Sequence, residues 1–165
     1  MQVYQGKVWK YGDNINTDII SPPASLELSI KEAAKYAMMN VDPDFGKQAQ
    51  PGDMFVAEHN LGSGSSRETS PLMLKELGIR AVIAKSFARI FYRNVINVGM
   101  LAIQCADTDK ISKGDVISID LNRQVIDNLT TKETYPISPI PAHILTLIEK
   151  GGLIPYVEYK MAGGK

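Results

Sequence analysis

The sequence contains very little cysteine, histidine and tryptophan. Its 165 residues include one cysteine (Cys105), two histidines and one tryptophan. A single cysteine excludes an intrachain disulfide, and it is too few to ligate an iron–sulfur cluster or a cysteine-rich metal site. We therefore expect no metal site in this chain and a reducing compartment.

Charge of one sign and long apolar runs are also missing. Eighteen basic residues balance eighteen acidic ones, so no strong field favours nucleic acid or an anionic membrane. No apolar run approaches the roughly 20 residues of a membrane span, and residues 1–10 lack the apolar segment of a signal peptide. The sequence predicts a soluble, cytoplasmic protein with one domain over residues 1–160 and a frayed tail at 161–165.

Short runs rich in β-branched and aromatic residues recur along the chain and are typical of strands. They predict strands at 7–11, 54–58, 81–85, 101–105, 116–121, 124–126 and 134–137. Between two of these runs, residues 121–124 read LNRQ, which predicts a hairpin turn.

Helical patterns alternate with these strands. Ser29 is followed three residues later by Glu32, the pattern of a capping box. An apolar stripe then predicts a helix that ends near Asn40; it consists of Ala33, Ala34, Ala37 and Met38. Further helices are expected at about 87–96 and 142–150, the second ended by two glycines.

One more helix is predicted through residues 72–77, ending at Gly78. Ser65 and Glu68 form one possible capping box for it, whereas Ser70 and Pro71 form a good N-cap and first helical residue. Proline deep in a helix costs a hydrogen bond, so we favour a turn over 62–69 before the helix. Alternating strands and helices predict an α/β fold with β-rich flanks.

The most informative motif is residues 62–68, which read GSGSSRE. Its glycines allow close backbone approach or positive φ, and its hydroxyls and arginine fit a small carboxylate or phosphate. It is neither a Walker A loop nor a nucleophile elbow, and it matches only half of a dinucleotide fingerprint. The alternative is an ordinary glycine-rich turn, in which Ser65 is a cap and Arg67 pairs with Glu68.

A second polar cluster, DNINTD, covers residues 13–18. Asx turns explain Asn14 and Asn16, because such side chains bond their own backbone. They explain Asp18 less well, since it precedes two isoleucines and a buried carboxylate there needs a partner. Arg67 is the candidate partner.

A third cluster, SFARIFYRN, covers residues 86–94. Phe87, Ile90, Phe91 and Asn94 share one side of the expected helix, and Arg89 and Arg93 share another. Solvated surface arginines remain the alternative to an anion site. Outside this cluster, His59 precedes the glycine turn and is either a titrating group or a structural histidine, while Cys105 is expected to be a small buried hydrophobe.

These three clusters, in this order, resemble the aconitase superfamily. More narrowly, they resemble its swivelling-domain subunits, which are the small subunits of 3-isopropylmalate dehydratase and of relatives such as dimethylmalate dehydratase. The resemblance covers most of the chain, and its most specific string is residues 60–68 (NLGSGSSRE). It implies a swivelling β/β/α domain with a mixed, barrel-like sheet and flanking helices.

The resemblance also implies a partner. In this family a large subunit carries a [4Fe–4S] cluster, whose open iron binds substrate, and the small subunit closes over it in a heterodimer or heterotetramer. The implied activity is that of a hydro-lyase active only with the large subunit. It isomerises a small 2-hydroxy dicarboxylic acid by dehydration and rehydration, as in leucine biosynthesis.

Matched position by position to the family motif, Ser65 resembles the catalytic base that removes a proton next to a carboxylate. Ser66 and Arg67 resemble contacts to the substrate carboxylate, and Asp18 resembles the active-site aspartate. Because a serine alkoxide is implausible at its free pKa, the surroundings of Ser65 must stabilise the anion.

Substrate choice is expected in the segment after Ser21-Pro22, where relatives acting on tricarboxylates place an arginine. Here residues 23–29 contain no basic side chain, and Leu26 and Leu28 suit an apolar substituent. This favours 3-isopropylmalate. Dimethylmalate, citramalate or a homoaconitate-type substrate stays open, because one methylene changes binding by only about 1–3 kcal/mol. A non-catalytic binding module that reuses the fold is the remaining alternative.

Overall fold

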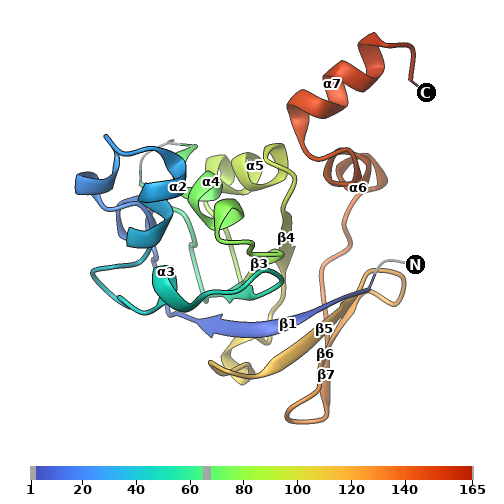
Figure 1. Ribbon diagram of the computed structural model, residues 1–165. Helices are drawn as coiled ribbons and strands as arrows, with labels where there is room; N and C mark the ends of the chain where they lie inside the picture. The colour runs from blue at the N-terminus through green and yellow to red at the C-terminus, as the bar shows by residue number, and fades with distance from the viewer. Residues whose placement is uncertain (1–2, 65–67, 165) are drawn as a thin grey trace.

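The structure of the protein is a computed structural model that describes residues 3–64 and 68–164. Over these residues seven strands form one mixed sheet in the order β4-β3-β2-β1-β5-β6-β7 (Figure 1). All seven predicted strands are confirmed, with ends shifted by a few residues. They are β1 (Val3–Lys10), β2 (Met54–Val56), β3 (Ala81–Ala84), β4 (Leu101–Gln104), β5 (Val116–Asp120), β6 (Val125–Asn128) and β7 (Glu133–Pro136).

Strand β1 joins two differently built halves of the sheet. On one side β1, β2, β3 and β4 are parallel, and on the other β1, β5, β6 and β7 are antiparallel. Strands β2 and β3 are buried at every position, as expected of parallel strands that are covered on both faces. The antiparallel strands β6 and β7 follow one another as hairpins, and the LNRQ turn joins β5 to β6 as predicted.

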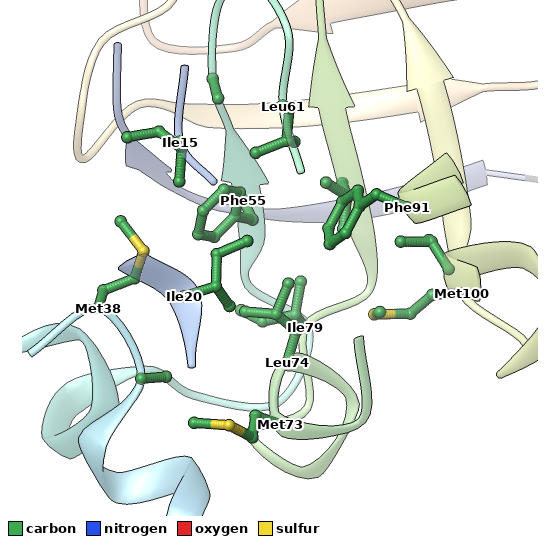
Figure 2. Close-up of a cluster of buried hydrophobic side chains, with 14 of the residues drawn as sticks. Ile15, Ile20, Met38, Phe55, Leu61, Met73, Leu74, Ile79, Phe91 and Met100 are labelled. Carbon is green, nitrogen blue, oxygen red and sulfur yellow. The ribbon is translucent and has the colours of Figure 1, made fainter. Parts of the chain in front are cut away.

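Two apolar cores lie on the two faces of the parallel strands, and side chains alternate between them. Met54 and Val56 of β2 join Ile117 and Ile126 in the core enclosed by the curled sheet. Phe55, between them, joins the core beneath the helices, which Figure 2 shows with Phe91 and other apolar residues around it. The predicted α/β class, a mixed sheet with flanking helices, is confirmed.

The helices lie mostly on one face of the parallel half (Figure 1). They are α1 (Thr17–Ile20), α2 (Ile30–Ala33), α3 (Phe45–Gln48), α4 (Thr69–Glu76), α5 (Arg89–Asn97), α6 (Ala142–Glu149) and α7 (Leu153–Met161). Three short 3-10 helices are η1 (Pro23–Ser25), η2 (Ala34–Tyr36) and η3 (Thr108–Lys110). No helix in the described part of the chain has the length and apolar character needed to cross a bilayer.

The predicted cap at Ser29 is confirmed, because its side chain accepts a hydrogen bond from the Glu32 amide. The helix is shorter than expected. It ends at Ala33 and continues only as η2, because the chain turns through Met38 with φ 61°. The apolar stripe is nevertheless buried, so the stripe indicated the packed face but not the helix length.

The prediction of Ser70 as the N-cap of the next helix is wrong. Helix α4 begins at Thr69, and Pro71 occupies its third position, where no intrahelical amide bond is lost. The Ser70 hydroxyl is buried and bonds the Thr17 carbonyl (3.1 Å) and the Ser21 hydroxyl (2.8 Å) instead. The competing capping box at Ser65 falls outside the described residues.

Cys105 is buried as predicted, and burial raises the pKa of its thiol. Ile90 was expected to share one side of α5 with Phe91 and Asn94, but it is 49% exposed whereas those two residues are buried. Helix α7 was not anticipated; it includes Met161, the first residue of the expected tail, and stands away from the sheet in Figure 1.

One buried polar contact ties β1 to β2 and gives a test of the fold. The Asp53 carboxylate is 7% exposed and accepts hydrogen bonds from the Trp9 indole (2.9 Å) and the Gln50 amide (2.8 Å). We expect Asp53→Ala to lower the free energy of unfolding by about 1–3 kcal/mol, because the buried indole N–H loses its acceptor. Urea denaturation is the measurement, and Asp44→Ala, at an exposed aspartate, is the control. Equal stability of the two variants would contradict this account.

Candidate functional site

The candidate site lies at the carboxyl edge of the parallel strands, where ligands of α/β sheets commonly bind. Three loops meet there: residues 11–16 after β1, residues 57–64 after β2 and residues 85–88 after β3. The first two contain motifs singled out in the sequence, and the third begins the SFARIFYRN cluster. The parallel order of the strands is therefore what brings the three motifs together.

Main-chain hydrogen bonds fasten the first loop to the second. The Asn14 amide donates to the His59 carbonyl (2.8 Å), and the Gly62 amide donates to the Ile15 carbonyl (2.7 Å). The Thr17 amide then donates to the Ser63 carbonyl (2.9 Å). The second loop is thus held along its length and extends the pairing of β1 with β2 beyond the strands.

The third loop holds the other side of the second. Leu61 donates its amide to the Ser86 carbonyl (3.0 Å) and accepts from the Ala88 amide (2.9 Å), forming a short parallel bridge beside Phe87. The Ser86 hydroxyl also accepts from the Asn60 amide (2.8 Å). Leu61 itself is fully buried, and Figure 2 shows it in the same core as Ile15.

Gly62 is required by both backbone conformation and packing. Its φ is +87°, a region that side chains disfavour. A Cβ at this position would also overlap the ring of Phe91, which is buried on α5. The first glycine of the GSGSSRE motif therefore has a structural role, because it lets the loop lie directly on helix α5.

The DNINTD segment behaves partly as an Asx-rich turn, as predicted. The Asn16 side chain caps α1 by accepting from the Ile19 amide (2.9 Å). Asn14 departs from the prediction, because its side chain accepts from the distant Asn60 side chain (3.1 Å). Asp13 contacts the second loop, since its carboxylate accepts the His59 amide (2.9 Å) and lies 3.1 Å from the His59 ring. These bonds lower the pKa of Asp13, the backbone bond to His59 having the largest effect.

Asp18 is exposed in the first turn of α1, not buried as expected from its isoleucine neighbours. Its neighbour Thr17 contacts residues on both sides of the SSR stretch at 65–67. The Cβ direction of Gly64 points at the Thr17 hydroxyl, and the Ser70 hydroxyl bonds the Thr17 carbonyl. The first turn of α1 therefore adjoins both described ends of the motif.

The other predicted site residues fall into two groups. Ser65, Ser66 and Arg67 lie outside the described residues, so their predicted roles stay predictions. Leu26 is half-buried at the end of η1, and Leu28 is 37% exposed beyond it. Both follow α1 in the chain, and among the described residues neither belongs to the two buried cores.

A half-buried charged cluster supports this edge and was not predicted. Lys10, at the end of β1, donates to the carbonyls of Thr108 and Ile111 (2.8 Å each). Its ammonium lies 3.8 Å from Glu58, which also accepts from the Thr108 hydroxyl. In the sequence, the polar residues that follow β2 and β3 were the available signal for this cluster. The pairing of Glu58 with Thr108 has no local signal, because it requires the tertiary fold.

Lys85 completes this cluster at the end of β3. Its ammonium lies 3.0 Å from Asp109 and 4.0 Å from Glu58. The bond to Asp109 raises the pKa of Lys85 and lowers that of Asp109. The ends of β1, β2 and β3 are thus joined by charges on the side of the loops away from α5.

The described residues offer no group of three or more histidine, cysteine, aspartate or glutamate side chains that could hold a metal. Cys105, the one thiol of the chain, is buried and carries a raised pKa, so it does not fit a cluster ligand. A hollow of about 570 Å³, lined in part by Lys75 and Arg80, opens at the amino edge of β3 and β4. It lies at the opposite end of the strands from the three loops.

The contact between Asp13 and His59 predicts a pH dependence of the loop pairing. Because the folded-state pKa of Asp13 is lowered, its stabilising effect is present above the ordinary carboxyl pKa and is lost as the pH falls through the lowered value. Carbon-13 NMR titration should give Asp13 a midpoint below 3.8, with the His59 amide resonance moving along the same curve. Asp13→Asn should abolish that coupled movement, and an unshifted Asp13 midpoint would contradict the geometry.

Comparisons with known proteins agree with this architecture. A family model described as the aconitase C-terminal domain matches residues 17–108. The 3-isopropylmalate dehydratase small subunit of Nautilia profundicola is 47% identical, covering 100% of both chains. The isopropylmalate/citramalate isomerase small subunit of Methanocaldococcus jannaschii is 46% identical, covering 97% of this chain and 96% of that protein.

A solved structure extends the agreement to three dimensions. The crystal structure of 3-isopropylmalate dehydratase from Methanocaldococcus jannaschii superposes with a TM-score of 0.93 at 38% identity, covering 98% of this chain and 96% of the other. The sheet order and the loop edge are thus those of a known fold. The chain belongs to the small-subunit family of 3-isopropylmalate dehydratases within the aconitase superfamily.

Proposed function

We propose that this chain is the small subunit of a two-subunit hydro-lyase that isomerises 3-isopropylmalate by dehydration and rehydration. The observation that carries the proposal is near-full-length identity of 44–49% to several proteins named as 3-isopropylmalate dehydratase small subunits. The fastened loop edge agrees with it, because main-chain hydrogen bonds to the loops after β1 and β3 hold the residues where the GSGSSRE motif begins. A non-catalytic module would not need to keep Ser65, Arg67 and Asp18 together.

In the proposed reaction, Ser65 removes the proton next to a substrate carboxylate, while Ser66 and Arg67 bind that carboxylate. A guanidinium gives a carboxylate two parallel hydrogen bonds and lowers the cost of negative charge near the Ser65 oxygen. Asp18 orients polar groups from the first turn of α1. Support comes from the residues on either side of residues 65–67, since the Ser63 carbonyl and the Ser70 hydroxyl both form hydrogen bonds with the main chain of Thr17.

The iron–sulfur cluster of this enzyme class belongs, in this proposal, to a large-subunit partner. The described residues of this chain do not fit such a cluster, as their one thiol is buried. The chain contributes the base and the carboxylate contacts, and the partner completes the site in a heterodimer or heterotetramer. The chain alone should therefore be inactive.

The alkyl group of the substrate is proposed to meet Leu26 and Leu28. Their segment carries no positive charge between residues 12 and 29, so a third carboxylate would lack a counter-charge. The Methanocaldococcus relative is named for both isopropylmalate and citramalate. Citramalate is therefore the second candidate substrate, since it too is a malate with an apolar alkyl substituent and no third carboxylate.

The proposed base can be tested in the reconstituted enzyme. The two subunits are co-expressed without oxygen and assayed with 3-isopropylmalate, citramalate and dimethylmalate. Ser65→Ala should lower kcat by about 100-fold or more while substrate still binds, because general-base assistance is lost. Ser112→Ala, at an exposed serine outside the three loops, is the control. A near-normal kcat for Ser65→Ala would remove Ser65 as the base.

Substrate selection is tested by adding a charge to the proposed pocket. Leu26→Arg should lower kcat/KM for 3-isopropylmalate and raise the relative rate with a tricarboxylate analogue, because the guanidinium pairs with the added carboxylate. Leu129→Arg, at an exposed leucine after β6, is the matched control. An unchanged substrate profile for Leu26→Arg would show that residues 23–29 do not meet the variable group.

A further inference from the structure

The hollow at the amino edge of β3 and β4 has the size of a small-molecule site. Its volume is about 570 Å³, within the range of about 300–1,000 Å³ that is usual for ligand pockets. Its floor is apolar, because it is formed by the buried residues Ile79, Met100 and Leu101 at the starts of the two strands. Ile148 of α6 contributes to one wall. The apolar chain of a ligand therefore has a surface on which to pack.

Close backbone contacts fix the walls of this hollow. Gly78 follows α4 with φ +86°, and a Cβ there would lie 2.6 Å from the Cα of Pro51. Gly99 follows α5 with φ +88°, and a Cβ there would lie 2.6 Å from the carbonyl of Gly151. All four residues are held by their neighbours without a ligand. The hollow is therefore preformed, which lowers the cost of ordering the protein on binding.

Two cations line the hollow: Lys75 in the last turn of α4, and Arg80 directly before β3. Neither has a carboxylate within salt-bridge distance among the described residues. Lys75 donates to the Val98 carbonyl (2.6 Å), whereas the Arg80 Cζ lies 5.1 Å from the centre of the Tyr4 ring. Stacking uses the face of the guanidinium and leaves its edge N–H groups available to a carboxylate.

The charge balance of the hollow limits the charge of its ligand. Glu149, at the end of α6, is the one acidic side chain among the described residues that line it. Two cations and one carboxylate leave a single positive charge. A monocarboxylate cancels this charge, whereas a dicarboxylate such as 3-isopropylmalate brings a second carboxylate without a partner. The hollow is therefore not a second site for the proposed substrate.

We propose that the hollow binds a monocarboxylate with a short apolar chain. The carboxylate accepts two parallel hydrogen bonds from the edge of Arg80, Lys75 adds positive charge, and the chain packs on Ile79 and Met100. Because the hollow lies at the opposite end of the strands from the three loops, this ligand is an effector. It contacts the ends of α4 and α5, which begin directly after the GSGSSRE motif and the third loop. These two helices connect the hollow to the loop edge.

Binding is tested on the full chain by amide NMR titration, with 4-methylpentanoate as the probe. The amides of Ile79, Arg80 and Leu101 should move along one saturation curve, with a dissociation constant on the order of 1 mM. Acetate lacks the apolar chain and 4-methylpentan-1-amine carries the opposite charge, so each should bind at least about tenfold more weakly. Absence of saturable binding would overturn the proposal, as would equal binding of the amine.

Substitutions then locate the bound carboxylate. Arg80→Gln should raise the dissociation constant at least about tenfold, because two charged hydrogen bonds are lost, and Arg80→Lys should give an intermediate value. Arg93→Gln is the matched control, at an exposed arginine that lines a smaller groove between α5 and α6, and should leave the constant unchanged. Weaker binding in Arg93→Gln but not in Arg80→Gln would place the ligand in that groove and contradict the assignment.

The effector role is measured in the reconstituted enzyme and rests on the proposed function. Saturating 4-methylpentanoate should change kcat/KM for 3-isopropylmalate by about fivefold or more, and the Arg80→Gln enzyme, with normal basal activity, should not respond. An unchanged kcat/KM would refute this role, as would inhibition that persists in Arg80→Gln, which indicates competition at the active site. An enzyme that does not turn over 3-isopropylmalate at all would count against the proposed function, whereas the binding experiments decide the site separately.

Discussion

The candidate site depends on the main-chain pairing of two loops at the carboxyl edge of the sheet. Residues 12–17 and 58–63 exchange amide hydrogen bonds beyond the ends of β1 and β2, so the glycine motif starts from a fixed backbone. Gly62 makes this possible, because only a residue without a side chain can hold φ +87° against the ring of Phe91. Without that close contact, the second loop could not lie between its two neighbours.

The support beneath this edge differs on its two faces. On the helix face the loops bury apolar side chains, among them Ile15 and Leu61, in the core that Figure 2 shows. On the other face Glu58, Lys10 and Lys85 join three strand ends by charge. Apolar burial fixes position without direction, whereas half-buried ion pairs and hydrogen bonds fix orientation. Both are needed where a carboxylate ligand must be gripped with defined geometry.

Local sequence signals succeeded where a residue bonds within its own element. Ser29 caps the helix that follows it, and Asn16 caps α1, because donor and acceptor are three residues apart. Local sequence signals failed where the side chain bonds a residue far away in the sequence. Ser70 resembled a cap, but its hydroxyl is used by Thr17 and Ser21, which no local pattern encodes.

The sequence by itself determined the strand positions, the α/β class, the family and the order of the three polar motifs, since these follow from hydrophobic period and from strings of adjacent residues. Only the tertiary structure decided that Asp18 is exposed, that Glu58 meets Thr108, and that α7 stands away from the sheet (Figure 1). These features depend on which elements become neighbours after folding. Contacts between residues 50 or more positions apart are set by strand order and packing, and a linear pattern does not contain them.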